Sequence, residues 1–343
     1  MSERRGVVIV GEFSEANLAP ITTELLAIGR RLADESGQEL SAVFIGNEIS
    51  DQVTSEAIFF GADRVYVIDA PLFKDYLNDS YVRALEKLDK EIMPEVLLLG
   101  HTSLGRDVAP RLAFRLDTGV TLDCIDLSID AKTKLVEKTK PVYGGNAIAK
   151  YICEEGHPQM ATVRAKVVSP LGRDASRSGE IVAFDSGLDE VAMRGKVVGR
   201  VKEEVVGVKL EDADVVICGG RGLGGAEPFE KLRELAGSLN GAVGATRPPC
   251  DAGWCPYHYQ IGLTGKLISP SLYIGIALSG SSQHQAGISG CKTIVAINND
   301  PEANIFGIAH YGVIADYQKV LPSFIEKCRE LSSRKDDRSN YFD

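Results

Sequence analysis

Polar side chains gather directly after a predicted strand in the last third of the chain. Residues 273–278 are almost wholly apolar, and the chain then continues as Ser279-Gly280-Ser281-Ser282-Gln283-His284. A continuous apolar run indicates a strand covered on both faces. A glycine-serine turn that opens a helix presents N–H groups and hydroxyls to an anion. Residues 279–284 therefore predict a phosphate-binding turn.

The next two predicted strands also end in polar residues. Residues 293–297 are followed by Asn298, and residues 312–315 are followed by Asp316. The carboxyl ends of parallel strands meet at one edge of a sheet, and open α/β sheets bind their ligands at that edge. These three strand ends together predict a nucleotide site.

Two residues that can carry positive charge flank this predicted site. Arg247 is the only lysine or arginine between Gly244 and Lys266, and two prolines after it stiffen its loop. His284 ends the phosphate-binding turn. Positive groups stabilise the negative charge that develops on a reduced flavin, so the pair indicates redox tuning. The spacing alone does not choose between a flavin and NAD.

A second glycine-rich segment, GGRGLGG at residues 219–225, follows the predicted strand 215–218. Gly220, Gly222 and Gly225 fall at G-x-G-x-x-G spacing, which lets a backbone approach a pyrophosphate. No acidic residue follows the next strand, where a ribose clamp is expected. This absence weakens the case for an NAD site, and an NAD-dependent dehydrogenase is kept only as an alternative function.

Composition limits the class of protein. The chain has 343 residues, 44% of them hydrophobic, which is enough for two domains with separate cores. Its net charge of −10 argues against a nucleic-acid partner. No run approaches the ~20 apolar residues of a spanning helix, and no signal peptide is evident. We expect no membrane insertion and a cytoplasmic location in a bacterium, or an organelle matrix for a processed form.

The cysteines and histidines do not predict a metal or iron–sulfur site. Seven cysteines are dispersed without a C-x-x-C pair, and the five histidines lack metal-ligand spacing. Cys250 and Cys255 are the one close pair. Two loop thiols in a reducing compartment are the preferred interpretation, and a redox or disulfide role is the alternative.

The pattern of the chain predicts an α/β protein of two domains. Strands are expected at 7–10, 40–45, 64–68 and 96–100, with helices at 21–36 and 80–93 between them. Residues 101–116 read as a polar turn that opens a helix, which in isolation suggests a nucleotide site. Residues 124–140 and 151–168 alternate apolar and polar residues, which predicts antiparallel additions to a parallel sheet.

The expected domain limits follow from these patterns. Residues 1–205 form the N-terminal α/β domain, in which 172–180 is an exposed loop. Residues 206–331 form a doubly wound, flavodoxin-like or DHS-like C-terminal domain, which includes a helix at 228–239. Residues 332–343 form a polar tail.

Several segments together resemble one known family, the electron-transfer flavoprotein α subunit (EtfA/FixB). The resemblance is carried by Leu272-Tyr273, Ser279-Gly280, Gln283-His284, Gly287 and the run from Lys292 to Ala303. GGRGL at 219–223 and GATRPPCDAGW at 244–254 also resemble family segments. Further matches, at LAPIT, VYGGNAIAK and ATVRAK, extend the resemblance over nearly the whole chain.

The resemblance implies one FAD, held mainly by the C-terminal domain. By position, Arg221 would contact the pyrophosphate region, and Thr246 and Arg247 would contact the flavin. The flavin edge would be lined by Ile261, Gly262, Leu263 and Thr264, with Thr264 near flavin N5. The phosphates would be held by Ser279, Gly280, Ser281, Ser282 and Gln283, which would place His284 at the pyrimidine carbonyl. The adenosine end would be taken by Asn298, Asp316 and Tyr317.

The resemblance also implies partners: a β subunit, a flavin dehydrogenase such as an acyl-CoA dehydrogenase, and a quinone-linked oxidoreductase, as in fatty acid β-oxidation. The implied chain is an electron-carrier subunit rather than a stand-alone enzyme. For residues 101–116 the resemblance implies a structural or subunit-interface role instead of a nucleotide site. A bifurcating mode, with NADH and ferredoxin, is the alternative within the family. Two departures concern the flavin site: Leu263 replaces a usual glutamine, and Ser281-Ser282 replaces two usual apolar residues.

Overall fold

The computed structural model describes residues 4–145, 147–188, 195–199 and 208–339, with side chains described as far as residue 331. The chain forms two compact units. One comprises Met1–Val142 and Asn146–Val201, and the other comprises Tyr143–Gly145 and Lys202–Asp343. The domain boundary predicted at 205/206 lies outside the described residues.

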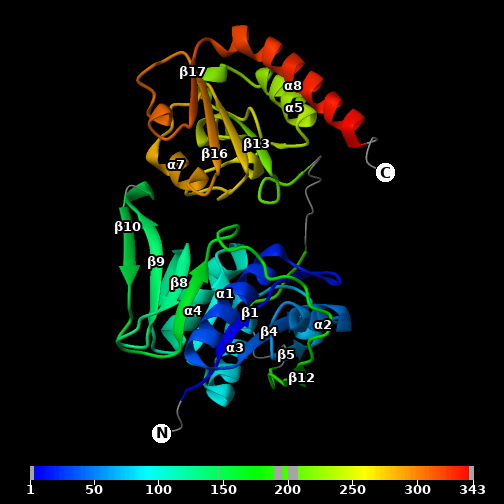
Figure 1. The fold of residues 1–343 in the computed structure, drawn as a ribbon, viewed down its shortest axis with the longest axis vertical. Helices are drawn as coiled ribbons and strands as arrows, with labels where there is room; N and C mark the ends of the chain where they lie inside the picture. Colours follow the sequence, from blue (N-terminus) through cyan, green and yellow to red (C-terminus); the bar gives the residue numbers. More distant parts are fainter. Residues whose placement is uncertain (1–3, 146, 189–194, 200–207, 340–343) are drawn as a thin grey trace. The chain divides into compact units, whose positions relative to one another are not determined.

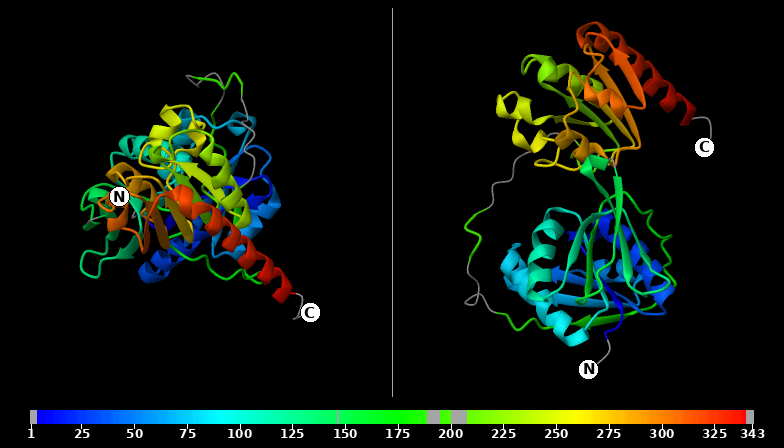
Figure 2. Two further views of the ribbon diagram at one scale, coloured as in Figure 1. Left: turned by 90° about the horizontal axis from the view of Figure 1, so that it is seen from above. Right: turned by 90° about the vertical axis from the view of Figure 1, so that its left-hand side faces the viewer.

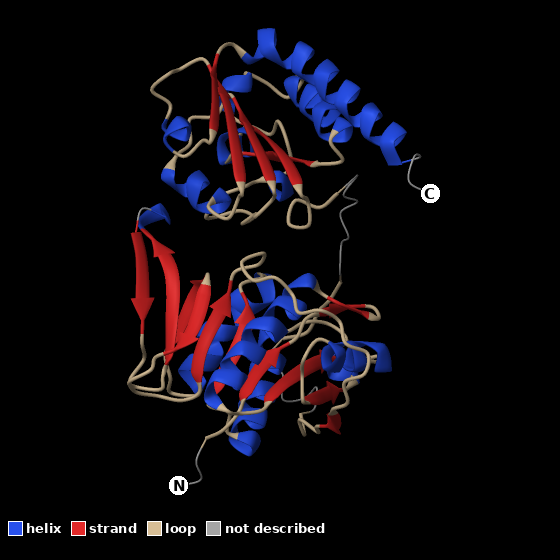
Figure 3. Ribbon diagram, in the orientation of Figure 1, coloured by secondary structure: helices blue, strands red, loops and turns tan. Residues whose placement is uncertain are grey.

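The first unit is built on a seven-stranded parallel sheet with the order β12-β5-β4-β1-β6-β11-β7 (Figures 1 and 3). Its strands are β1 (Val7–Val10), β4 (Leu40–Gly46), β5 (Arg64–Asp69), β6 (Val96–Gly100), β7 (Val120–Cys124), β11 (Gln159–Val163) and β12 (Glu180–Ala183). Its helices are α1 (Pro20–Ser36), α2 (Asp51–Phe59), α3 (Asn78–Ile92) and α4 (Ser103–Arg115). Short strands β2 (Phe13–Ser14) and β3 (Asn17–Leu18) form a separate hairpin.

Helices cover both faces of this sheet because β1 is apolar on both sides. Val7 and Ile9 pack in a core with α1 and α2, whereas Val8 and Val10 pack in a second core with α3 and α4. A strand that is buried on both faces reads as a continuous apolar run, which is why the sequence located it.

The predicted antiparallel pairing of residues 151–168 is wrong, because β11 runs parallel between β6 and β7. All five residues of β11 are buried, including two polar ones. Gln159 Oε1 accepts the Val136 N–H at 2.8 Å, and Thr162 Oγ1 accepts the Asp123 N–H at 3.0 Å. Polar side chains satisfied inside the core thus imitate the alternation of a half-exposed strand.

The antiparallel pairing predicted within 124–140 is confirmed for β8 (Asp126–Ile129) and β9 (Val136–Val142). With β10 (Ala147–Tyr151), these strands form their own three-stranded sheet, ordered β10-β9-β8, instead of extending the parallel sheet. A 3₁₀ turn, η2 (Tyr143–Gly145), joins β9 to β10.

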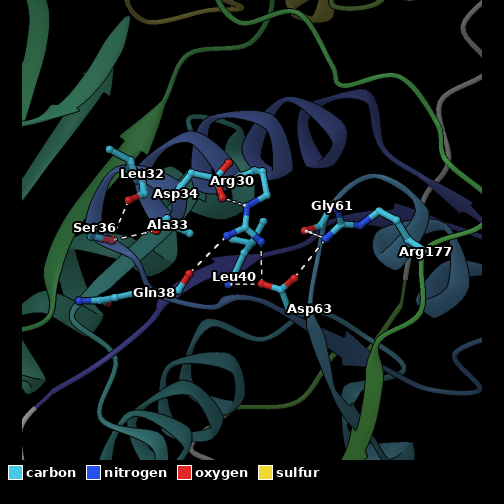
Figure 4. Close-up of polar contacts among 10 residues, drawn as sticks. All are labelled: Arg30, Leu32, Ala33, Asp34, Ser36, Gln38, Leu40, Gly61, Asp63 and Arg177. Carbon is cyan, nitrogen blue, oxygen red and sulfur yellow. Dashed lines mark hydrogen bonds and ion pairs between the residues drawn. The ribbon is translucent and has the colours of Figure 1, made fainter.

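The segment at 172–180 is largely an exposed loop, as expected, and Arg177 ties it to the sheet. Arg177 donates to Asp63 at 3.1 Å and to the Gly61 carbonyl at 3.3 Å. Asp63 also accepts from Arg30 of α1 at 2.6 Å and from the Leu40 N–H at 2.9 Å (Figure 4). The carboxylate of Asp63 thereby joins α1, β4 and the segment that leads into edge strand β12.

The second unit is built on a five-stranded parallel sheet with the order β14-β13-β15-β16-β17 (Figure 3). Its strands are β13 (Val215–Gly219), β14 (Ala242–Ala245), β15 (Leu272–Ile276), β16 (Thr293–Asn298) and β17 (Tyr311–Ile314). Its α-helices are α5 (Pro228–Ser238), α6 (Arg247–Asp251), α7 (Ser282–Ile288) and α8 (Tyr317–Ser339). Single 3₁₀ turns occur at η4 (Arg221–Leu223), η5 (Tyr257–Tyr259) and η6 (Asn304–Gly307).

The second unit is also covered on both faces. Helices α5 and α8 lie side by side over one face (Figures 1 and 2). The other core contains Ile288 of α7 with Tyr273 and Ile305. The doubly wound architecture predicted from the sequence is confirmed. The segment predicted as a polar tail from 332 continues helix α8 as far as Ser339.

Candidate functional site

A cavity of about 610 Å³ opens at the carboxyl edge of the five-stranded sheet. Its wall takes residues that follow each strand, from Thr246 after β14 to Asp316 after β17. Five strands about 4.8 Å apart give an edge of roughly 19 Å, which suits an extended dinucleotide. The chain passes from β13 to β14 on one side and returns to β15 on the other. Strands β13 and β15 therefore flank the topological switch point, where such sheets bind ligands.

The turn after β15 forms the centre of the cavity wall, and its shape is fixed by close contacts. Gly280 has a φ of 77°, and a Cβ there would lie 2.6 Å from the Ile305 nitrogen, so only glycine fits. Asn298 at the end of β16 donates its side-chain amide to the Leu278 carbonyl at 2.8 Å. The ends of β15 and β16 are thereby held in one arrangement.

The glycine-rich loop after β13 packs against this same turn. A Cβ on Gly220 would overlap the Ala277 carbonyl oxygen, and a Cβ on Gly222 would lie 2.8 Å from it. The Gly222 N–H also donates to that carbonyl at 3.0 Å. Packing against β15 thus accounts for both glycines without a bound NAD. Between them, Arg221 is exposed and lies in the cavity wall.

His284 reaches the cavity wall as a buried, neutral side chain. Its Nδ1 lies 3.1 Å from the Ile261 carbonyl and its Nε2 lies 2.7 Å from the Tyr273 hydroxyl. A carbonyl can only accept, so Nδ1 carries the proton and the Tyr273 hydroxyl donates to Nε2. Burial lowers the pKa of His284 to about 4. The positive charge that the sequence interpretation assigned to His284 is therefore wrong at neutral pH.

At the equivalent edge of the first unit, side chains that follow β1 and β6 hydrogen-bond to each other. Strands β1 and β6 flank the switch point of that sheet. Glu12, which follows β1, accepts a 2.6 Å hydrogen bond from Thr102, which also caps α4 by accepting the Gly105 N–H. Burial raises the pKa of Glu12. These contacts give the start of α4 a structural role.

The cavity brings together residues of the predicted site that come from every strand end of the second unit. They are Arg221, Thr246, Ser279, Gly280, Ser281, His284, Asn298, Asp316 and Tyr317. The wall also contains residues that the family resemblance did not assign to FAD: Gly222, Pro248, Ala277, Leu278, Ile297, Asn299, Asp300, Ala315 and Gln318. Most of these are neighbours of predicted residues at a strand end. Including the residues on either side of each predicted one would have found them.

Other predicted residues lie outside this wall. Arg247 begins α6 directly after Thr246, and its exposed guanidinium pairs with Asp251 at 3.1 Å. Neither Ser282 nor Gln283 of α7 belongs to the wall.

The predicted flavin-edge loop, which contains Ile261, Gly262, Leu263 and Thr264, also lies outside the wall and packs on α7. The Leu263 N–H donates to the Gln283 carbonyl at 2.8 Å. The hydroxyl of Thr264 accepts the side-chain amide of Gln260 at 2.9 Å.

Two residues predicted for the adenosine end use their polar atoms within the chain. The Asn298 side chain joins two strand ends, and the Tyr317 hydroxyl donates to the Leu223 carbonyl at 2.9 Å. Both therefore shape the cavity. Asp316 is exposed at the end of β17 and accepts the Gln318 N–H at 2.9 Å.

Comparison with known proteins decides the family. A model of the electron transfer flavoprotein domain matches residues 7–188, and one of the electron transfer flavoprotein FAD-binding domain matches residues 209–289. The electron transfer flavoprotein subunit alpha of Thermoanaerobacterium thermosaccharolyticum is 43% identical over 331 residues, covering 96% of this chain and 100% of that protein. The chain belongs to the electron transfer flavoprotein α-subunit family.

Other members of the electron transfer flavoprotein family are similarly close. The subunit alpha of Megasphaera elsdenii is 40% identical over 96% of this chain and 98% of its own length. The protein FixB of Azorhizobium caulinodans is 39% identical over 95% of this chain and 89% of its own length. The family resemblance noted in the sequence is confirmed, and so is electron transfer as the general role.

FAD is the cofactor of this family's C-terminal domain, and the cavity suits it chemically. A pyrophosphate needs a cation and hydrogen-bond donors, and the wall offers Arg221 with the hydroxyls of Ser279 and Ser281. The edge also has the length of a dinucleotide, as estimated above. When bound, FAD supplies the ring that stores electrons.

Among the described residues, no helix is long and apolar enough to cross a membrane.

Proposed function

We propose that this chain holds its FAD along the cavity and works as half of a heterodimer with a β subunit. In this role it carries electrons from a flavin dehydrogenase, such as an acyl-CoA dehydrogenase, to a quinone-linked oxidoreductase. The observation that carries the proposal is the cavity at the switch point, whose wall is drawn from all five strands of the FAD-binding unit.

Different residues of this unit would contact different parts of FAD. Arg221 and the serines after β15 hold the pyrophosphate. The loop 261–264 borders the flavin, and Arg247 provides positive charge near the ring once its guanidinium leaves Asp251. His284 holds α7 against the loop at Ile261 and the strand at Tyr273, because both of its ring nitrogens already have partners in the chain.

The packing of Gly220 and Gly222 against Ala277 argues against the alternative of an NAD-dependent dehydrogenase. Close packing explains why glycine stands at both positions. The G-x-G-x-x-G spacing is therefore not evidence for a nicotinamide site.

The test is to co-express the chain with its β subunit and record the visible spectrum of the purified pair. The proposal expects a flavin spectrum that bleaches when acyl-CoA and its dehydrogenase are added, and recovers with a quinone-linked oxidoreductase. A colourless pair would contradict flavin binding. Bleaching by NADH that depends on ferredoxin would instead assign the bifurcating mode.

A further inference from the structure

Two cysteines of the FAD-binding unit, five residues apart in the sequence, have their sulfur atoms in contact. Cys250 lies in α6 and Cys255 follows the turn after it, and their sulfur atoms are 3.5 Å apart. Both side chains are buried, at 3% and 5% exposure. A disulfide has a sulfur–sulfur distance of about 2.05 Å, so closing the bond requires a combined movement of about 1.5 Å.

The backbone between the two cysteines holds them in this arrangement. The Gly253 N–H donates to the Cys250 carbonyl at 2.9 Å, and the Trp254 N–H donates to the Pro249 carbonyl at 3.0 Å. Gly253 has a φ of 72°, which turns the chain back toward α6. The two thiols therefore meet without any search by the chain, which favours reaction with each other over reaction with a second molecule.

The cysteine pair is directly connected to the cavity. Thr246 and Pro248, at the start of α6, lie in the cavity wall, and Cys250 lies in the same short helix. Asp251, the next residue, pairs with Arg247 and accepts the Tyr257 hydroxyl at 3.0 Å. Movement of Cys250 toward Cys255 thus displaces the element that bears Arg247.

We propose that Cys250 and Cys255 form a redox-active dithiol, which a hydroperoxide oxidises to an internal disulfide that alters the FAD cavity through α6. This chemistry goes beyond the function of the chain as an electron carrier.

The chemistry begins at one sulfur and ends at the other. A hydrogen bond joins the two thiols, and either sulfur can be its donor; it lowers the pKa of Cys255 and raises that of Cys250. The Cys250 thiol also donates to the Pro256 carbonyl at 3.7 Å. The Cys255 thiolate attacks the hydroperoxide, the O–O bond breaks, and a sulfenic acid and an alcohol, or water, result. The Cys250 sulfur then attacks the sulfenic sulfur, and the hydroxyl leaves with the Cys250 proton as water. Two thiols lose two electrons, and the peroxide gains them.

The experiment uses the full chain with its β subunit, exposed to increasing hydrogen peroxide, acid-quenched, alkylated and analysed by peptide mass. We expect the peptide with Cys250 and Cys255 to lose both alkylation sites and two hydrogen masses together, reversibly with dithiothreitol. Cys328 of the same unit, which is buried on α8, serves as an internal control. The variants Cys250→Ser and Cys255→Ser should each abolish the internal bond.

The second measurement is the FAD affinity of the heterodimer with the two cysteines reduced and after oxidation, for the wild-type chain and for Cys255→Ser. A change of several-fold on oxidation that the variant lacks supports the coupling to the cavity. The proposal is overturned if both thiols remain alkylatable after peroxide oxidises other cysteines, or if the disulfide forms without any change in FAD affinity. The thiol measurement does not require bound FAD, so its failure is distinguishable from failure of the proposed function.

Discussion

The Tyr273 hydroxyl donates to His284 Nε2 at 2.7 Å inside the FAD-binding unit, where both side chains are buried. Tyr273 is fully buried on β15, and His284 lies on α7, so the bond joins the sheet to the helix that begins at the cavity. The imidazole is held at its other nitrogen by the Ile261 carbonyl. Its tautomer is therefore set by the fold before any cofactor binds.

Replacing Tyr273 with phenylalanine should remove the hydrogen bond to Nε2 without changing the tautomer. The change leaves Nε2 buried without a donor, which costs about 1–3 kcal/mol of unfolding free energy. Nitrogen NMR of the His284 ring should show the Nδ1–H tautomer in both chains, because the Ile261 carbonyl still accepts from Nδ1, and a shifted Nε2 resonance in Tyr273→Phe. Tyr257→Phe, at an exposed tyrosine, is the matched control and should change neither the Nε2 resonance nor the stability. An unchanged Nε2 resonance and unchanged stability in Tyr273→Phe would contradict this role.

The FAD-binding unit should lose stability on acidification, because His284 is buried in its neutral form. Its pKa is lowered to about 4 in the folded chain and lies near 6.5 when unfolded. The unfolded state thus binds the proton first as pH falls. The contribution of neutral His284 to the free energy of unfolding is complete above pH 6.5. It decreases toward pH 4, by up to about 3 kcal/mol.

Trp254, the only tryptophan in the chain, lies in the FAD-binding unit and reports its unfolding by fluorescence. Denaturant titrations between pH 4 and 7 should show a smaller dependence on pH in His284→Asn than in the wild type. His157→Gln, in the first unit, should keep the wild-type slope. Equal slopes in all three chains would show that His284 does not govern the acid response.

Arg221 should contribute to FAD affinity through its charge. A charged hydrogen bond to the pyrophosphate is worth about 1.5–3 kcal/mol, so Arg221→Gln should raise the FAD Kd about 10- to 100-fold. The measurement is titration of FAD into the deflavinated heterodimer. Arg233→Gln removes an arginine of α5 that lies outside the cavity wall, and it should leave the Kd unchanged. A similar loss in both variants would indicate a general effect of net charge.

Asn298 should matter more for the shape of the cavity than Asn299 beside it. Asn298→Ala frees the turn after β15 from the end of β16, since the bond to Leu278 is lost. We expect the free energy of unfolding to fall by about 1–3 kcal/mol and the FAD Kd to rise roughly 10-fold. Asn299 is exposed in the same wall, and Asn299→Ala should change stability little. The opposite ranking would remove Asn298 from this role.

The sequence predicted the strands of both units well where they are buried on both faces, as in β1 and β15. It misjudged β11 because Gln159 and Thr162 are polar yet satisfied by hydrogen bonds in the core. It pointed to the sheet edge at which the structure has a cavity, since strand ends and turn residues are local signals. The neutral state of His284 depends on Tyr273 and Ile261, whose contact with it is a property of the tertiary structure.

The central claim is that FAD lies along the carboxyl edge of the second sheet, with its pyrophosphate at the β13–β15 switch point. A crystal structure of the FAD-loaded heterodimer tests it most directly. The account predicts phosphate oxygens within hydrogen-bonding distance of Arg221 and of the turn that contains Ser279 and Ser281. FAD bound elsewhere on the chain, or another ligand filling this cavity, would contradict it.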